Sequence, residues 1–118
     1  MLLIELRATL AHWAAAKPLV GRAWIFGSRA RGQEKTDSDL DIAIELDLSA
    51  AQEMDDSAGS ATWMLETGSW EAELAAIFPY EIDLEQFMGD KTPIISAALQ
   101  RSSALAYEKP KSTIGSRN

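Results

Sequence analysis

The segment from Asp39 to Leu46 constrains the fold of this chain more than any other, because its side chains alternate without a break. One set of alternate residues is apolar and the other is acidic or small: Leu40, Ile42, Ile44 and Leu46 against Asp39, Asp41, Ala43 and Glu45. Successive side chains of a β-strand point to opposite faces of its sheet. Residues 40–46 are therefore predicted to form a strand with one face in a core and carboxylates on the other.

Further strands are expected on both sides of this one in the sequence. Residues 22–26 are a β-prone run that ends at a Gly-Ser turn, and residues 81–87 alternate again. Residues 104–107 are expected to form a short edge strand. The chain is thus predicted to contain several short strands, with helices between them.

Apolar residues recur at helical spacing in three other segments. They predict an N-terminal helix over residues 1–17, a second helix that ends at Phe78, and a last helix opened by Pro93 in its first turn. The apolar stripes are Leu3, Leu6, Leu10 and Trp13; Trp63, Trp70, Leu74 and Ile77; and Ile94, Ala98 and Leu99. Residues 47–60 are acidic and Ser-rich, which indicates a loop or a weak surface helix.

Composition indicates one small globular domain. The chain has 118 residues, 47% of them hydrophobic, and we expect a domain over residues 1–108 and a disordered tail over residues 109–118. Eleven basic and 18 acidic residues give a net charge of −7, which argues against a general role in coating DNA or RNA. The absence of cysteine excludes disulfides, thiolate zinc sites and a Cys nucleophile, and a lone His12 cannot build a metal site.

The N-terminal segment is apolar, but charged residues interrupt it early. Glu5 and Arg7 leave no stretch long enough for a signal peptide or a membrane span. We therefore expect a cytoplasmic protein with no membrane association.

The turn at Gly27 and Ser28 is the first candidate for ligand binding. Glycine has no Cβ, so a strand that ends at Gly27 lets the backbone approach a ligand closely. If Ser28 begins a short helix, its hydroxyl and the free N–H groups of the first turn form a small anion site. A phosphate group fits there, although the dipeptide alone is also typical of an ordinary strand-ending turn.

Carboxylates on two strands are the second candidate. Asp39 and Asp41 lie at positions i and i+2, so both side chains leave the same face of the strand. Mg²⁺ is usually bound by one or two carboxylates together with substrate phosphate oxygens. Asp83 offers a third carboxylate, and three from two strands could hold two metal ions, with Asp83 the candidate base. The alternative is a solvated acidic face, and Glu85 shares the face of Asp83.

The remaining polar residues near these motifs are open to two interpretations. At least one of Arg29 and Arg31 either contacts a phosphate or orders the loop, or both are solvated surface residues or ion-pair partners of Glu34 and Asp37. Asp37 is expected to belong to the loop and Glu45 to the surface. The tryptophans are expected in the core, and Tyr80 and Tyr107 are interpreted as structural residues because no base lies near them in the sequence.

These residues resemble a known signature. Gly27-Ser28, ten intervening residues and Asp39-Leu40-Asp41 are similar to the Gly-Ser-x10-Asp-x-Asp motif of the DNA polymerase β-like nucleotidyltransferases. The longer run Phe-Gly-Ser-Arg-Ala-Arg-Gly resembles their minimal nucleotidyltransferase branch, and Ile82-Asp83-Leu84 resembles the strand of their third carboxylate. The resemblance covers about residues 22 to 108, and residues 47–68 fit it poorly.

The resemblance implies a fold and a reaction. The fold is α/β, with a small mixed β-sheet packed with helices. The reaction uses ATP or another NTP with two Mg²⁺ ions, for which Mn²⁺ could substitute, and transfers a nucleoside monophosphate to a hydroxyl. It assigns Asp39, Asp41 and Asp83 to metal and catalysis, and Gly27, Ser28, Arg29 and Arg31 to the nucleotide.

The same resemblance implies a partner. Many stand-alone minimal nucleotidyltransferases are similar to antitoxins that pair with a HEPN-type RNase toxin and add AMP to one of its tyrosines. A chain of 118 residues leaves little room for a pocket of its own for an acceptor, so we expect the acceptor to be a partner protein. The alternative is a non-catalytic module that neutralises or scaffolds a partner by contact.

Overall fold

A four-stranded mixed sheet forms the centre of the computed structural model, which describes residues 1–32, 38–51 and 60–110. The strands lie in the order β3-β2-β1-β4. Their bounds are Val20–Phe26 (β1), Leu40–Leu46 (β2), Ile82–Gln86 (β3) and Ser103–Glu108 (β4). β1 is antiparallel to β2 and β4, whereas β2 is parallel to β3. All four predicted strands are confirmed, each within two residues of its predicted bounds.

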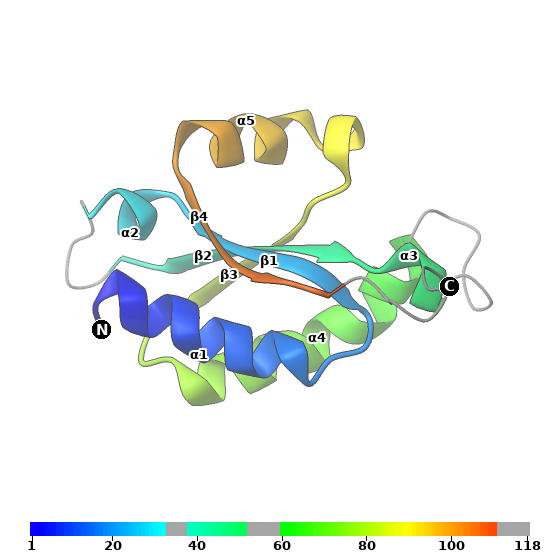
Figure 1. Cartoon of the computed structure of the whole chain (residues 1–118), viewed down its shortest axis with the longest axis horizontal. Coiled ribbons are helices and arrows are strands. Elements are labelled where there is room, and N and C mark those ends of the chain that lie inside the picture. The colour runs from blue at the N-terminus through cyan, green and yellow to red at the C-terminus, as the bar shows by residue number, and fades with distance from the viewer. Residues whose placement is uncertain (33–37, 52–59, 111–118) are drawn as a thin grey trace, which may run out of the picture.

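Helices cover both faces of this sheet. In Figure 1, α1 (Leu3–Ala15) and α4 (Ser60–Ile77) lie below the sheet, and α5 (Pro93–Arg101) lies above it. Three short helices follow strands: α2 (Ser28–Arg31) after β1, α3 (Leu48–Ala51) after β2, and the 3₁₀ helix η1 (Gly89–Lys91) after β3. The alternation in residues 40–46 explains the two layers, since each face of β2 packs against a different layer.

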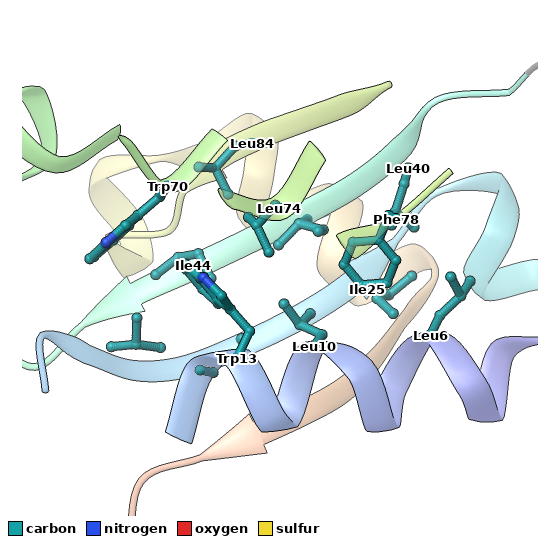
Figure 2. Packing of buried hydrophobic residues seen from close by; sticks show 14 of the residues in the cluster. Leu6, Leu10, Trp13, Ile25, Leu40, Ile44, Trp70, Leu74, Phe78 and Leu84 are labelled. Carbon is teal, nitrogen blue, oxygen red and sulfur yellow. The ribbon is translucent and has the colours of Figure 1, made fainter. Parts of the chain in front are cut away.

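The larger core lies between the sheet and the helices α1 and α4. Figure 2 shows Leu6, Leu10 and Trp13 of α1 pointing toward the sheet, where Ile25 and Ile44 meet them. Trp70 and Leu74 of α4 complete the cluster, and the rings of Trp13 and Trp70 meet edge to face with centroids 5.7 Å apart. The apolar stripe predicted for α1 is therefore confirmed.

The prediction for α4 is wrong at one residue of its apolar stripe, Ile77. Ile77 is 41% exposed, whereas Phe78, just after the last helical residue, is 4% exposed and packs in the core. Both follow Leu74 by about one helical turn, and the larger aromatic ring fills the space. Trp63 packs against the cluster as a partly buried residue.

The smaller core lies between the sheet and α5. Trp24, Phe26 and Ala43 are buried there, and Ile95, Ala98 and Leu99 of α5 pack on them. The predicted stripe of α5 contained Ile94, which is 82% exposed, so that prediction is wrong. Ile95 takes its place, because spacings of three and four place residues 95, 98 and 99 on one helix face.

The segments without clear periodicity are only partly described. α3 occupies the start of the segment predicted to be a loop or weak helix, and residues 52–59 and Asp37 lie outside the described residues. Lys109, the first residue of the predicted tail, is bonded to the body, since its Nζ contacts Asp47 at 2.6 Å and Pro18 O at 2.8 Å. Residues 111–118 of that tail are also outside the described part. No described helix is long and apolar enough to cross a membrane.

Candidate functional site

The parallel pairing of β2 with β3 brings two of the predicted aspartates together. Asp41 and Asp83 are register partners, and each is the second residue of its strand. Asp39 lies just before β2 and is exposed, as is Asp83, whereas Asp41 is half-buried. The sequence placed Asp39 and Asp41 on one strand face, and the strand register adds Asp83 to that face.

Crowding of these carboxylates changes their acidity. Burial, followed by the charge and the hydrogen bond of Asp83 and the charge of Asp39, raises the pKa of Asp41 to about 6. The positive charge of Arg29 opposes this shift. Burial and contact with Asp83 raise the pKa of Glu85 to about 7. The cluster therefore carries more negative charge than its cationic surroundings compensate, which favours binding of a cation.

Gly27 stands directly beside this cluster. Phe26, the last residue of β1, is the register partner of Asp41, so the turn after β1 passes next to the Asp41 carboxylate. Gly27 has φ +75° and ψ −151°, a conformation that is essentially restricted to glycine. A Cβ at this position would collide with Asp41 Oδ2. The backbone conformation thus favours glycine here, and any other residue would also have to displace the Asp41 carboxylate.

Ser28 begins the short helix α2, which is the condition set above for an anion site at this turn. The backbone N–H of Ala30 donates to Gly27 O at 3.1 Å, and the helix ends at Gly32 in the left-handed conformation. The first N–H groups of any helix have no partner within the helix. Those of α2 lie immediately after the glycine that touches Asp41, so the turn and the carboxylates form one site.

The two arginines of the motif lie in different environments. Arg29 is 5% exposed, its Nη2 donates to Ser38 O at 2.7 Å, and its guanidinium carbon lies 3.7 Å from the centroid of the Tyr80 ring. Arg31 is exposed, and its Nη1 donates to Ser102 Oγ at 3.1 Å. Arg29 is therefore not a solvated surface residue, and its hydrogen bond to Ser38 O ties α2 to the segment just before Asp39.

Sequence reasoning missed two features of this site. Tyr80 was interpreted as structural, and its contact with Arg29 has no local signal because the two residues are far apart in the sequence. The alternation places Glu85 on the face of Asp83, but the raised pKa that burial and contact with Asp83 give it has no signal in the sequence. The partners Glu34 and Asp37, considered for the arginines, lie outside the described residues.

The donor atoms suit a hard divalent cation. All the clustered groups are carboxylates, the ligands that Mg²⁺ and Mn²⁺ prefer, and their uncompensated charge is what a cation would relieve. Within the described ranges, no three His, Asp or Glu side chains already converge in a metal-binding arrangement. Asp41 and Asp83 are the adjacent pair, and Mg²⁺ often takes only one or two carboxylates together with substrate phosphates.

Comparison with known proteins identifies the family and the fold. A family model described as "Polymerase beta, Nucleotidyltransferase" matches residues 9–112. A chain of a solved structure described as "Crystal structure of the toxin-antitoxin with AMP-PNP" is similar, with a TM-score of 0.50 and 20% identity over 78% of this chain. The present chain spans 64% of that neighbour's length, and at this identity the likeness concerns the fold. A search of curated proteins found no match.

Proposed function

Because the chain belongs to the polymerase beta nucleotidyltransferase family, we propose that it transfers a nucleoside monophosphate, AMP from ATP, to a hydroxyl group. Membership confirms the predicted α/β fold with its small mixed sheet. The observation that carries the proposal is the pairing of Asp41 with Asp83 beside the Gly27 turn. In such a site the two carboxylates would serve as cation ligands next to a backbone turn that would approach the phosphates.

Different residues of the site would have different roles in such a transfer. Asp39 and Asp41 would hold the nucleotide's Mg²⁺ or Mn²⁺, Asp83 would contribute to a second ion, and Gly27, Ser28 and Arg31 would face the phosphates. Bound divalent ions supply neutralisation of the phosphate charge that develops during the reaction. Arg29 is buried, and we assign it to the support of the site.

The transfer itself is a displacement at phosphorus. The acceptor hydroxyl oxygen forms a bond to the α-phosphorus, and the bond from that phosphorus to the pyrophosphate oxygen breaks. The proton of the hydroxyl passes to the carboxylate of Asp83, the exposed member of the pair. Pyrophosphate leaves with the negative charge, so atoms and charge balance.

The acceptor that we propose is a tyrosine on a HEPN-type toxin, which would make this chain an antitoxin in a hetero-oligomer. The similar structure, described as a toxin-antitoxin with AMP-PNP, supports a toxin as the partner and an adenine nucleotide as the ligand. The net charge of −7 supports it as well, because an acidic surface would steer association with a basic RNA-cutting protein.

Replacement of Asp83 by asparagine tests this function. Asp83→Asn removes the proposed base but keeps the shape of the side chain, so transfer of labelled AMP to a co-purified partner should fall by about 10² or more. The nucleotide should still bind, since Asp39 and Asp41 remain. Asp90→Asn, in η1, is the matched control and should transfer AMP at the wild-type rate.

Protection of cells from the toxic partner separates this function from its rival. If protection requires transfer, the Asp83→Asn chain should fail to protect while the Asp90→Asn chain protects. Full protection by a chain that is shown to be inactive in transfer would instead support a module that neutralises its partner by contact.

A further inference from the structure

Arg29 joins three separate segments of the candidate site. It belongs to α2, which begins beside Gly27, and its Nη2 donates to the carbonyl of Ser38, next to Asp39. Its guanidinium also lies 3.7 Å from the ring centroid of Tyr80, which precedes β3 and Asp83. One side chain of α2 therefore contacts both the residue before Asp39 and the residue that leads to β3.

The environment of Arg29 is unusual for a surface helix. The residue is 5% exposed, and its Nε has no hydrogen-bond partner among the described residues. Burial of a charged group is unfavourable unless the surroundings compensate for it. The ring of Tyr80 provides cation–π stabilisation, the Ser38 carbonyl accepts one hydrogen bond, and the nearby carboxylate cluster balances the charge. These contacts hold the guanidinium in one orientation.

From these contacts we propose that Arg29 and Tyr80 are positioning residues, which fix the segment Ser38–Asp39 and thereby set the distance between Asp39, Asp41 and Asp83. This inference deepens the proposed function and rests on it. Neither side chain needs to touch the nucleotide, because the effect passes through the backbone of Ser38. A planar guanidinium is required, since the ammonium group of lysine cannot stack and donate in the same way.

The test uses four variants and Mn²⁺ as the probe. Tyr80→Leu removes the ring, Arg29→Lys keeps the charge but not the plane, and Tyr80→Phe keeps the ring. Tyr107→Leu is the matched control, since Tyr107 is likewise partly buried against the main core, on β4. Mn²⁺ affinity in the presence of AMP-PNP is measured from the paramagnetic resonance signal of free Mn²⁺, and amide exchange is followed in the peptide that contains Ser38.

We expect Tyr80→Leu and Arg29→Lys to weaken Mn²⁺ binding about tenfold or more, the effect of removing groups that orient metal ligands. Amide exchange at Ser38 to Leu40 should rise in both. Tyr80→Phe loses only the hydroxyl that accepts a hydrogen bond from the Met1 ammonium at 2.7 Å, and it should bind Mn²⁺ like the wild type. Tyr107→Leu should also bind normally, even if it lowers the melting temperature.

The outcomes distinguish this inference from the function on which it rests. If the wild type binds Mn²⁺ and Tyr80→Leu binds it equally well, the inference is wrong and the proposed function stands. If Arg29→Lys binds normally, charge alone is sufficient and the positioning role is wrong. If the wild type binds no Mn²⁺ with AMP-PNP, the proposed function fails, and the inference fails with it.

Discussion

Gly27 and Asp41 lie so close together that the glycine has no room for a side chain. The Cβ of any other residue would collide with Asp41 Oδ2, and the positive φ of Gly27 disfavours such residues independently. The turn that is expected to meet phosphates and the carboxylate that is expected to hold their cation are thus in direct contact. Each constrains where the other can be.

Replacement of Gly27 by alanine should disrupt the site and also lower stability. The strained conformation alone costs about 1–3 kcal/mol, and the methyl group must displace the Asp41 carboxylate. We expect a lower urea midpoint and loss of Mn²⁺-dependent nucleotide binding, measured by calorimetric titration.

Gly32→Ala is the matched control for that substitution. Gly32 also has a positive φ, +70°, but an added Cβ would meet nothing within 4 Å among the described residues. It should lose stability while it keeps nucleotide binding. Equal binding losses in the two variants would show that backbone strain, not contact with Asp41, causes the defect at Gly27.

Asp39 and Asp41 should control stabilisation by the nucleotide. Mg²⁺ with ATP at 100 times the dissociation constant should stabilise the wild type by about 2.7 kcal/mol, because the ligand binds only the folded state. The double variant Asp39→Asn/Asp41→Asn should show no shift of its melting temperature with Mg²⁺ and ATP. Asp90→Asn should shift like the wild type, and a normal shift in the double variant would contradict the metal assignment.

The sequence predicts much of this site because the signals are local. Alternation in residues 40–46 is complete, so Asp39 and Asp41 could be assigned to a face, and Gly27 marked the end of a strand. Asp83 could be assigned to a face of its own strand for the same reason. Its pairing with Asp41 depends on the parallel register of β2 and β3, which no local pattern specifies.

The features that were missed depend on contacts between distant segments. Arg29 could not be distinguished from a surface arginine, because its burial requires Tyr80 from another part of the chain. The predictions that Ile94 and Ile77 lie in the core are wrong by one residue each. Helical spacing defines an apolar stripe only to within about one residue at a helix end. Their neighbours Ile95 and Phe78 fill those places.

The ion pair between Lys109 and Asp47 should contribute a small part of the stability. Lys109→Ala should lower the free energy of unfolding by at most about 1 kcal/mol at pH 7, as is usual for a partly exposed pair, measured by urea unfolding.

The same ion pair should make stability depend on pH at the acid end. The pKa of Asp47 is lowered to about 2, first by its hydrogen bond with Lys109. Its contribution is therefore present above about pH 4 and lost as the pH falls toward 2. If the pair acts as a unit, Asp47→Asn combined with Lys109→Ala should lose little more than either change alone.

Asp41 should make the metal-free protein more stable as the pH falls toward 5, whereas the Asp47 ion pair loses its contribution only below about pH 4. Its pKa is raised to about 6 and that of Glu85 to about 7, above the values near 4 of unfolded chains. Between about pH 4 and 7 the folded state therefore holds protons that the unfolded state has released, so stability must rise as the pH falls through this range. We expect a higher urea midpoint at pH 5 than at pH 8, followed by tryptophan fluorescence. Asp41→Asn should be more stable than the wild type at pH 8, because the buried carboxylate that Asp83 repels is gone. It should lose the part of the slope that Asp41 contributes and keep the part that comes from Glu85. A wild-type midpoint that stays flat or falls from pH 8 to pH 5, or an unchanged slope in Asp41→Asn, would show that the carboxylates are not crowded in the folded protein.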